Sequence, residues 1–248
     1  MPAVFVHGNP ETPAVWAPLL AELGRDDVLT PRLPGFGVPT PEGFGATMDE
    51  YVDWLAQELE AIGEPVDLVG HDWGGGFVLR IACTRPELLR SWVSDVAGLL
   101  DPEYVWHDMA QIWQTPDAGE EAVAAAAAMQ DADFAALLTA NGVTPEAAAD
   151  FAAAFDDEMG RCVLALYRSA AQPAMREWGA DVPAARARPG LVITGTADPF
   201  TGGPHFSERM AEQLGARFES LDDLGHWWML EDPRRAAAVI EEFWRSIA

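Results

Sequence analysis

Asp72 lies at the centre of a glycine-rich segment, Gly70-His71-Asp72-Trp73-Gly74-Gly75, between an expected strand at Val66–Val69 and an expected helix at Gly75–Cys83. Such a strand-to-helix turn exposes one side chain at its tip, and glycines flank the tip because the chain doubles back without room for Cβ atoms. The residue at the tip is normally serine, whereas here it is an aspartate. The positive end of a helix dipole is expected to keep this carboxylate ionised. The segment therefore predicts that Asp72 is a nucleophile.

A second motif, His7-Gly8-Asn9-Pro10, directly follows the apolar run Val4–Val6, which is typical of a buried strand. In a site of this kind, a loop at this point donates one backbone N–H to an oxyanion hole, and the residue after the nucleophile donates another. The two donors are therefore expected to be Asn9 and Trp73.

His226 stands in Gly225-His226-Trp227-Trp228, just after the last expected strand at Arg217–Ser220. A histidine at this point of the chain is expected to be the general base that activates water. The side chains of His7 and His71 are expected to make structural hydrogen bonds. The remaining two histidines fall outside these motifs, His107 in the middle of the chain and His205 in a Gly-Pro loop.

Two aspartates are candidates for the acid that orients the histidine. Asp198 follows the expected strand Leu191–Thr194, and Asp95 follows the expected strand Trp92–Ser94. Either carboxylate could accept a hydrogen bond from the histidine Nδ1–H. Asp198 is preferred because its loop has the more usual placement for this role, and Asp95 is kept as the alternative.

Short apolar runs alternate with amphipathic segments along the chain, which predicts an α/β protein with a doubly wound, mostly parallel sheet. Further expected elements are a weak strand at Val28–Thr30 and helices at Val15–Leu23, Met48–Ile62 and Arg234–Ile247. In such sheets the active site lies beyond the carboxyl ends of the strands. Residues 99–186 interrupt the alternation with an Ala-rich helical pattern. They are interpreted as a helical lid (cap) inserted into a core formed by residues 1–98 and 187–248.

The composition excludes some classes of partner. The 248-residue chain has a formal net charge of −25, from 15 basic and 40 acidic side chains. Nucleic acid and anionic membrane surfaces are poor partners for such a chain, because phosphate binding needs clustered Lys and Arg. Cys83 and Cys162 form no CxxC or metal-ligand spacing and are expected to be buried free thiols. With neither a signal peptide nor an apolar span in the sequence, a cytoplasmic location is expected. The protein is expected to be a monomer or homodimer.

The motifs together resemble the α/β-hydrolase superfamily and, within it, the group of haloalkane dehalogenases and epoxide hydrolases. The resemblance covers nearly the whole chain and is carried by His7-Gly8-Asn9-Pro10, by the segment around Asp72, by Asp198 and by His226. It implies that the aspartate attacks an sp³ carbon to form an alkyl-enzyme ester, which water activated by the histidine then hydrolyses. No metal or organic cofactor is implied.

The leaving group distinguishes the two activities within this group. A departing halide needs fixed, neutral N–H donors, which the indole of Trp73 and the side-chain amide of Asn9 could supply. An opening epoxide needs a proton donor, and epoxide hydrolases use two lid tyrosines. Tyr167 resembles the second of these, whereas Met109 stands where the first would be expected, with Tyr104 nearby as a substitute. Dehalogenation is preferred over epoxide hydrolysis.

Three further points concern the substrate and the alternatives. Ester hydrolysis and a non-catalytic binding role on the same fold remain as less favoured hypotheses. The substrate is expected to be a small, mostly apolar organic molecule, since Trp73 stands where an arginine would suit a halocarboxylate. Apolar lid residues expected near the substrate are Trp106, Met109, Trp113, Phe134 and Phe155.

Overall fold

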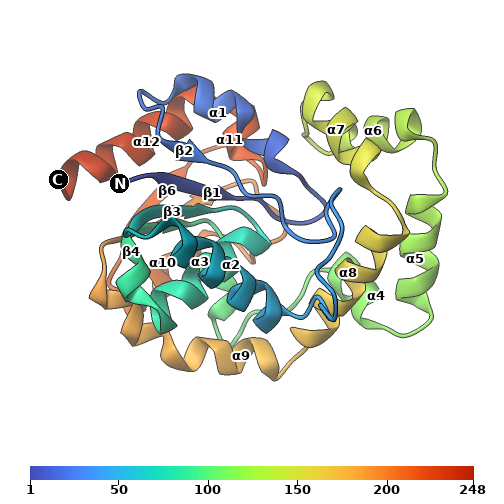
Figure 1. The fold of residues 1–248 in the computed structure, drawn as a ribbon, viewed down its shortest axis with the longest axis horizontal. Coiled ribbons are helices and arrows are strands. Elements are labelled where there is room, and N and C mark those ends of the chain that lie inside the picture. Colours follow the sequence, from blue (N-terminus) through green and yellow to red (C-terminus); the bar gives the residue numbers. More distant parts are fainter.

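The computed structural model describes all 248 residues, and its centre is a six-stranded sheet in the order β2-β1-β3-β4-β5-β6 (Figure 1). Every neighbouring pair is parallel. The strands are β1 (Ala3–Val6), β2 (Val28–Leu29), β3 (Val66–Gly70), β4 (Leu89–Ser94), β5 (Gly190–Gly195) and β6 (Arg217–Leu221). Parallel neighbours need crossover connections, which the helices provide. The predicted doubly wound sheet is confirmed.

Helices cover both faces of this sheet (Figure 1). One face carries α1 (Ala17–Glu22), α11 (Trp228–Glu231) and α12 (Pro233–Ser246), and the other carries α2 (Met48–Ile62), α3 (Trp73–Thr84) and α10 (Pro204–Leu214). Short 3₁₀ turns join the elements at η1 (Pro13–Trp16), η2 (Pro86–Leu88) and η3 (Ala97–Leu100).

Residue alternation along the strands builds two separate hydrophobic cores. In β1, Val4 and Val6 pack into the core on the α2–α3 face, whereas Ala3 and Phe5 pack into the core on the α1–α12 face. Successive side chains of a strand point to opposite faces, so an uninterrupted apolar run buries both sides at once. This arrangement anchors the carboxyl end of each strand, from which the loops of the candidate site emerge.

Helix α2 shows how local sequence sets the ends of an element. Thr47 accepts a hydrogen bond from the backbone of Glu50, and the Glu50 carboxylate accepts one from the backbone of Thr47, forming a capping box. Gly63 ends the helix in the left-handed conformation, with φ 81°. Because both ends carry such signals, the predicted bounds Met48–Ile62 are confirmed.

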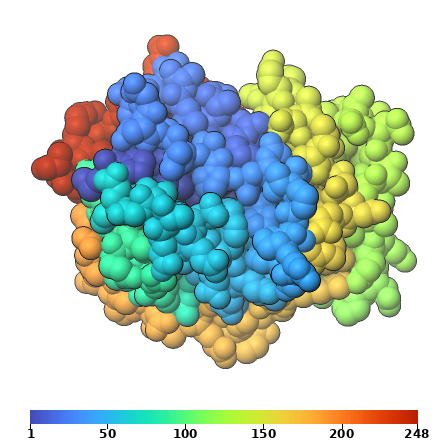
Figure 2. Space-filling view, in the orientation of Figure 1, coloured from blue at the N-terminus to red at the C-terminus, as the bar shows by residue number.

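The chain between β4 and β5 forms mostly helices. Five of them, α4 to α8, gather beyond one edge of the core (Figure 1) and meet the early loops of the chain in a continuous surface (Figure 2). Their bounds are α4 (Asp108–Gln114), α5 (Ala118–Ala127), α6 (Asp131–Ala140), α7 (Pro145–Ala154) and α8 (Asp157–Ser169). By contrast, η4 (Gly179–Ala187) packs on α3 in the core, and α9 (Ala174–Trp178) packs beside η4. The lid over residues 99–186 stays a proposal, and α4 to α8 are the helices of that range that lie away from the sheet.

The structure contains one element that was not expected. Helix α10 begins at Pro204, inside the segment interpreted as a Gly-Pro loop around His205. Proline is well tolerated in the first turn of a helix, so Gly203-Pro204 marks the start of a helix here. None of the helices combines the length and apolar character that crossing a membrane requires.

Candidate active site

Asp72 occupies the strained turn between β3 and α3. Its backbone has φ 49° and ψ −126°, outside the regions that most residues adopt. The close approach of Gly70 and Gly74 makes the turn possible: a Cβ on Gly70 would lie 2.3 Å from the carbonyl oxygen of Gly74. Strain of this kind persists only where the surroundings enforce it, and it is concentrated at functional sites.

The Asp72 carboxylate is held by neighbouring backbone groups and is largely buried. Asp72 Oδ1 accepts a hydrogen bond from the backbone N–H of Asn9 at 2.7 Å. The backbone N–H of Asp72 donates to Asp95 Oδ1 at 3.1 Å. Burial, together with the negative charge of Glu11, raises the pKa of Asp72 to about 6 against the opposing charge of His226. The expected effect of the helix end is therefore outweighed by loss of solvation. Asp72 remains mostly ionised at neutral pH.

His226 connects Asp72 to Asp198. Its Nδ1 donates to Asp198 Oδ2 at 2.9 Å, and its Nε2 lies 3.7 Å from Asp72 Oδ2. Asp198 is itself fixed by the backbone N–H of Phe200 at 2.7 Å. Burial lowers the pKa of His226, but the charge and hydrogen bond of Asp198, together with the Asp72 charge, outweigh it and the net shift is upward. Because Nδ1 carries the donated proton, the Nε2 lone pair of the neutral ring faces the Asp72 carboxylate.

Asp95 contacts a different histidine. One of its oxygens accepts hydrogen bonds from His71 Nδ1 and from Trp228 Nε1, the latter at 2.7 Å. The other oxygen holds the Asp72 backbone. Of the two candidate acids, Asp198 is therefore the one that contacts His226, while Asp95 supports the turn that carries Asp72.

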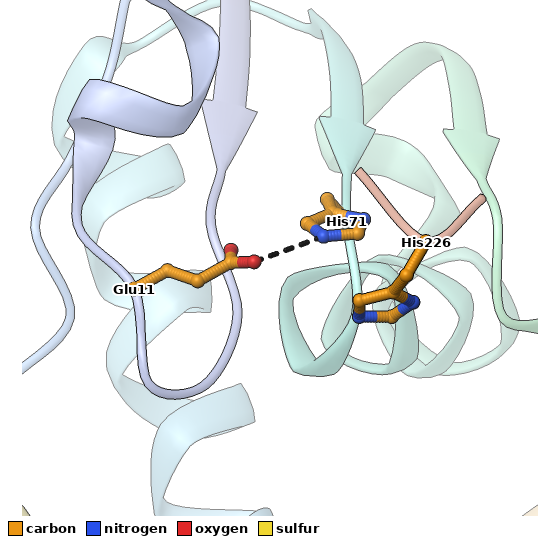
Figure 3. Close-up of side chains that lie close together, drawn as sticks. All are labelled: Glu11, His71 and His226. Carbon is orange, nitrogen blue, oxygen red and sulfur yellow. Dashed lines mark hydrogen bonds and ion pairs between the residues drawn. The ribbon is translucent and has the colours of Figure 1, made fainter. Parts of the chain in front are cut away.

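A buried ion pair between Glu11 and His71 lies next to His226, as Figure 3 shows. The Glu11 carboxylate accepts from His71 Nε2 at 3.0 Å, and the His71 ring lies 4.6 Å from the His226 ring. Burial lowers the pKa of His71, but Glu11 and Asp95 outweigh it and hold that pKa well above its usual value. The expected structural hydrogen bonds of His71 are confirmed, and the ring carries a positive charge.

Glu11, His71 and His226 also offer one metal-ligand atom each within 4.8 Å of one another (Figure 3). The Glu11 oxygen already accepts from His71 and from Trp227 Nε1 at 2.6 Å, and both His71 nitrogens are hydrogen bonded. The metal-ligand atoms of Glu11 and His71 are thus already engaged in hydrogen bonds, an arrangement that fits a hydrogen-bond network.

We predict that Asp198→Asn and Asp95→Asn separate these two roles. Asp198→Asn should reduce turnover by about 100- to 10,000-fold with little change in melting temperature, because the imidazole loses the partner that fixes its tautomer. Asp95→Asn should mainly lower the melting temperature, because His71 and the Asp72 turn lose a charged partner. Rates per folded molecule and thermal unfolding curves check this; a greater loss of rate in Asp95→Asn would reverse the assignment.

A small cavity adjoins Asp72 and His226. Its free volume is ≈10 Å³, about the space that the centre of a single water molecule needs. A larger substrate therefore enters only when the wall or the lid helices move. The wall is largely aromatic and has no lysine or arginine; besides Asp72 and His226 it consists of Trp73, Val96, Leu99, Tyr104, Trp106, His107, Tyr167, Phe200 and Thr201.

Four predicted lid residues lie outside the cavity wall. Met109 is 45% exposed at the surface of α4 and does not line the cavity. Trp113 packs against the Tyr167 ring at 4.7 Å and so supports the wall from behind. The chain turns into α4 at Asp108, which directs the side chain of Met109 away from the cavity. Phe134 and Phe155 pack against each other away from it.

Several cavity residues were not predicted from sequence. Phe200 and Thr201 lie two and three residues after Asp198, so their place in the same loop was a usable signal. His107 caps α4 through its Nδ1, which accepts from the Ala110 N–H at 3.3 Å. A histidine is an unusual cap, and the sequence alone contains no sign that it lines the same cavity as Asp72.

A larger hollow of ≈660 Å³ lies between the loop containing Thr40 and helices α7 and α8. Its polar contacts include a hydrogen bond from Thr40 to Glu158 at 2.6 Å and an ion pair between Arg32 and Asp150. No member of the Asp72–His226 group lines it. We therefore place the chemistry in the smaller cavity.

The fold and the turn around Asp72 define an α/β-type hydrolase. The chain belongs to the alpha/beta hydrolase family, whose model matches residues 3–239, and the resemblance expected from the motifs is confirmed. It is 29% identical to lipase LipV of Mycobacterium tuberculosis, covering 95% of this chain and 90% of the relative. It is 25% identical to haloalkane dehalogenase 2 of the same species, covering 98% and 87%.

Solved structures show the same fold. The haloalkane dehalogenase DbeA from Bradyrhizobium elkani superposes with a TM-score of 0.76 at 22% identity, covering 99% of this chain and 91% of that one. The relatives are all named as hydrolytic enzymes, but they include both a lipase and a dehalogenase. The class of enzyme is therefore a hydrolase, and the leaving group has to be argued from the site.

Proposed function

We propose that this hydrolase cleaves carbon–halogen bonds of small, uncharged organic molecules through an ester on Asp72. The observation that carries the proposal is the carboxylate at the tip of the strained turn, with Oδ1 held by Asn9 N–H and Oδ2 facing His226. A serine hydrolase has a hydroxyl at this point, which attacks carbonyl carbons. A carboxylate is suited instead to displacing a leaving group from an sp³ carbon.

In the first step, Asp72 Oδ2 attacks the carbon from the side opposite the halogen. The new C–O bond forms as the C–X bond breaks, and the halide leaves with the bonding electron pair. In the second step, water gives a proton to His226 Nε2 and attacks the ester Cγ, while the Asn9 N–H stabilises charge on Oδ1. Collapse releases the alcohol, which takes the proton from His226, and the regenerated carboxyl group loses a proton to water.

The side chain of Asn9 supports halide as the leaving group. Both polar atoms of its amide are buried without a hydrogen bond of good geometry, and the Tyr167 hydroxyl is the polar group that lies near Asn9 and near the indole of Trp73. Leaving a buried amide unpaired costs about 1–3 kcal/mol, so such a group is an expected ligand contact. Together with the indole of Trp73, which lines the cavity, it would offer the halide neutral, fixed donors.

Epoxide hydrolysis is the second candidate, and Tyr167 is the observation that favours it. Tyr167 lines the cavity, but burial and the Asp72 charge raise its pKa well above the usual value. The Tyr104 hydroxyl, which also reaches the cavity, already donates to the Phe200 carbonyl at 2.8 Å. A pair of free tyrosine donors is therefore not assembled, and we rank epoxide opening second.

A paired turnover assay tests this proposal. The purified enzyme is offered bromo- and iodoalkanes, with released halide measured, and styrene-type epoxides, with diol measured. We expect halide release at least tenfold above that of an Asp72→Asn control. Diol formation without halide would transfer the leaving-group role to Tyr167. If both reactions fail, the proposed activity is wrong, and ester substrates or a binding role would take its place.

A further inference from the structure

The hydroxyl of Thr201 is a polar group for which the protein supplies no partner. Thr201 is 2% exposed and lines the catalytic cavity, yet its Oγ1 makes no hydrogen bond within the protein. Buried polar groups are nearly always paired, and an exception needs an explanation. The other residues with such unpaired atoms are Asn9, Trp16, Trp92 and Trp244, and none of these is among the residues that line the cavity.

His107 places a second polar group in the same wall. Its Nδ1 accepts from the Ala110 N–H, so the neutral ring carries its proton on Nε2 and can donate there. Burial lowers the pKa of His107 to about 4, and the ring is neutral at physiological pH. The ring lies 5.0 Å from that of Phe200, the residue before Thr201.

These two groups come from parts of the chain other than those that hold the leaving group. Asn9 and Trp73 follow β1 and β3, whereas Thr201 follows β5 and His107 precedes α4. Apart from Asp72 and His226, the rest of the wall is apolar or aromatic. A substrate spanning the cavity would therefore meet polar contacts at two separate places, one of which is not needed for the departing halide.

The charge of the cavity restricts what this second place can bind. No lysine or arginine lines the wall, and Asp72 contributes a carboxylate. An anionic substituent would be repelled without a compensating cation. A neutral imidazole N–H and a threonine hydroxyl are instead suited to an uncharged oxygen atom.

We propose that Thr201 and His107 form a second polar subsite, which binds an uncharged hydroxyl or carbonyl oxygen on the substrate. This inference rests on the proposed dehalogenation and deepens it. The preferred substrate is a small halogenated alcohol, ketone or amide, and plain haloalkanes are poorer substrates because they leave Thr201 unpaired. Sites built to hydrogen-bond a substituent discriminate strongly against analogues that lack it.

The test compares 3-bromo-1-propanol with 1-bromobutane, two substrates with equal numbers of non-hydrogen atoms. We expect the ratio of their kcat/KM values to favour the alcohol in the natural enzyme. Thr201→Val, which replaces the hydroxyl by a methyl group, should lower that ratio about 5- to 50-fold. The same change at Thr139, an exposed residue of α6, is the matched control and should not alter the ratio. His107→Asn retains a helix-capping side chain and should lower the ratio too.

Binding measured without turnover separates this inference from the proposed activity. In the Asp72→Asn protein, the affinity for 1,3-propanediol should exceed that for 1-butanol, and adding Thr201→Val should remove most of the difference. If neither bromide is hydrolysed, the dehalogenation is wrong and this binding comparison alone decides the subsite. An unchanged kcat/KM ratio in Thr201→Val, or equal affinities for the two alcohols, would overturn the subsite.

Discussion

Asp72→Asn is expected to abolish turnover and, at the same time, to make the protein more stable at pH 8. Activity should fall by about 10,000-fold or more, as expected when a covalent nucleophile is removed. Asparagine tolerates the positive φ of 49° at this turn, and its amide oxygen can still accept from the Asn9 N–H. The loss of activity should therefore occur in a correctly folded protein.

The expected gain in stability follows from the pKa of Asp72. Burial raises it from 3.8 to about 6 in the folded protein, so the folded state binds the proton more tightly than the unfolded chain does. Ionisation of this group is therefore destabilising above pH 6, by up to about 3 kcal/mol. Below about pH 4 the carboxyl is protonated in both states, and the penalty disappears. Asp72→Asn should accordingly unfold later than the natural protein at pH 8, with the difference shrinking as the pH falls to 4.

Urea unfolding at pH 8 and pH 5, together with halide release, checks both parts of this prediction. Asp67→Asn is the matched control, since Asp67 is also a buried aspartate of β3 but binds Arg25 and Arg90. It should lower stability, because two arginines lose their partner, while turnover per folded molecule is retained. Retained turnover in Asp72→Asn would contradict the assignment of Asp72 as the nucleophile. A smaller gain in stability at pH 8 than at pH 5, each measured against the natural protein, would contradict the burial of Asp72.

Local patterns in the sequence were sufficient to locate the sheet and the turn around Asp72. Strands buried on both faces appear as continuous apolar runs, such as Ala3–Val6, and the helix Met48–Ile62 carries its own start and stop signals. The motifs at Asn9, Asp72 and His226 each follow a strand. The carboxyl ends of parallel strands lie at one edge of the sheet. The convergence of these residues can therefore be predicted without any knowledge of side-chain contacts.

The choice between Asp95 and Asp198 could not be made in the same way. Both follow strands that end at that edge, and β4 and β5 are direct neighbours. The distinction depends on the path of the loop that brings His226 back over the sheet, where its Nδ1 meets Asp198. His71, which lies on the same turn as Asp72, takes Asp95 instead.

The electrostatics of the site were the least predictable feature. A carboxylate at a helix terminus is expected to be stabilised, but the loss of most of the solvent around Asp72 reverses the sign of the shift. Glu11 contributes to this reversal and is itself paired with His71, sixty residues away in sequence. The exposure of Met109 has a simpler cause, because it depends on the residue at which α4 begins. A helix start one or two residues earlier or later turns a given side chain toward or away from the cavity.

His226→Gln is expected to stop the reaction after its first step and leave the alkyl group on the enzyme. The displacement of halide needs the Asp72 carboxylate but no base, whereas hydrolysis of the ester needs a group that removes a proton from water. Incubation with 1-bromobutane should therefore give a burst of at most one halide per enzyme. Intact-protein mass spectrometry should show the added butyl group, and peptide mapping should place it on Asp72.

The pH of this experiment matters because the two residues influence each other. The charge of His226 lowers the pKa of Asp72, so its removal should raise that pKa and slow the first step near neutrality. The burst should consequently need a higher pH in His226→Gln than in the natural enzyme, and pH 8.5 is a suitable starting point. His205→Gln, the same change at an exposed histidine of α10, should turn over normally and accumulate nothing. Multiple turnovers in His226→Gln would show that another group activates the water, whereas the absence of both burst and adduct at pH 8.5 would place His226 in the first step.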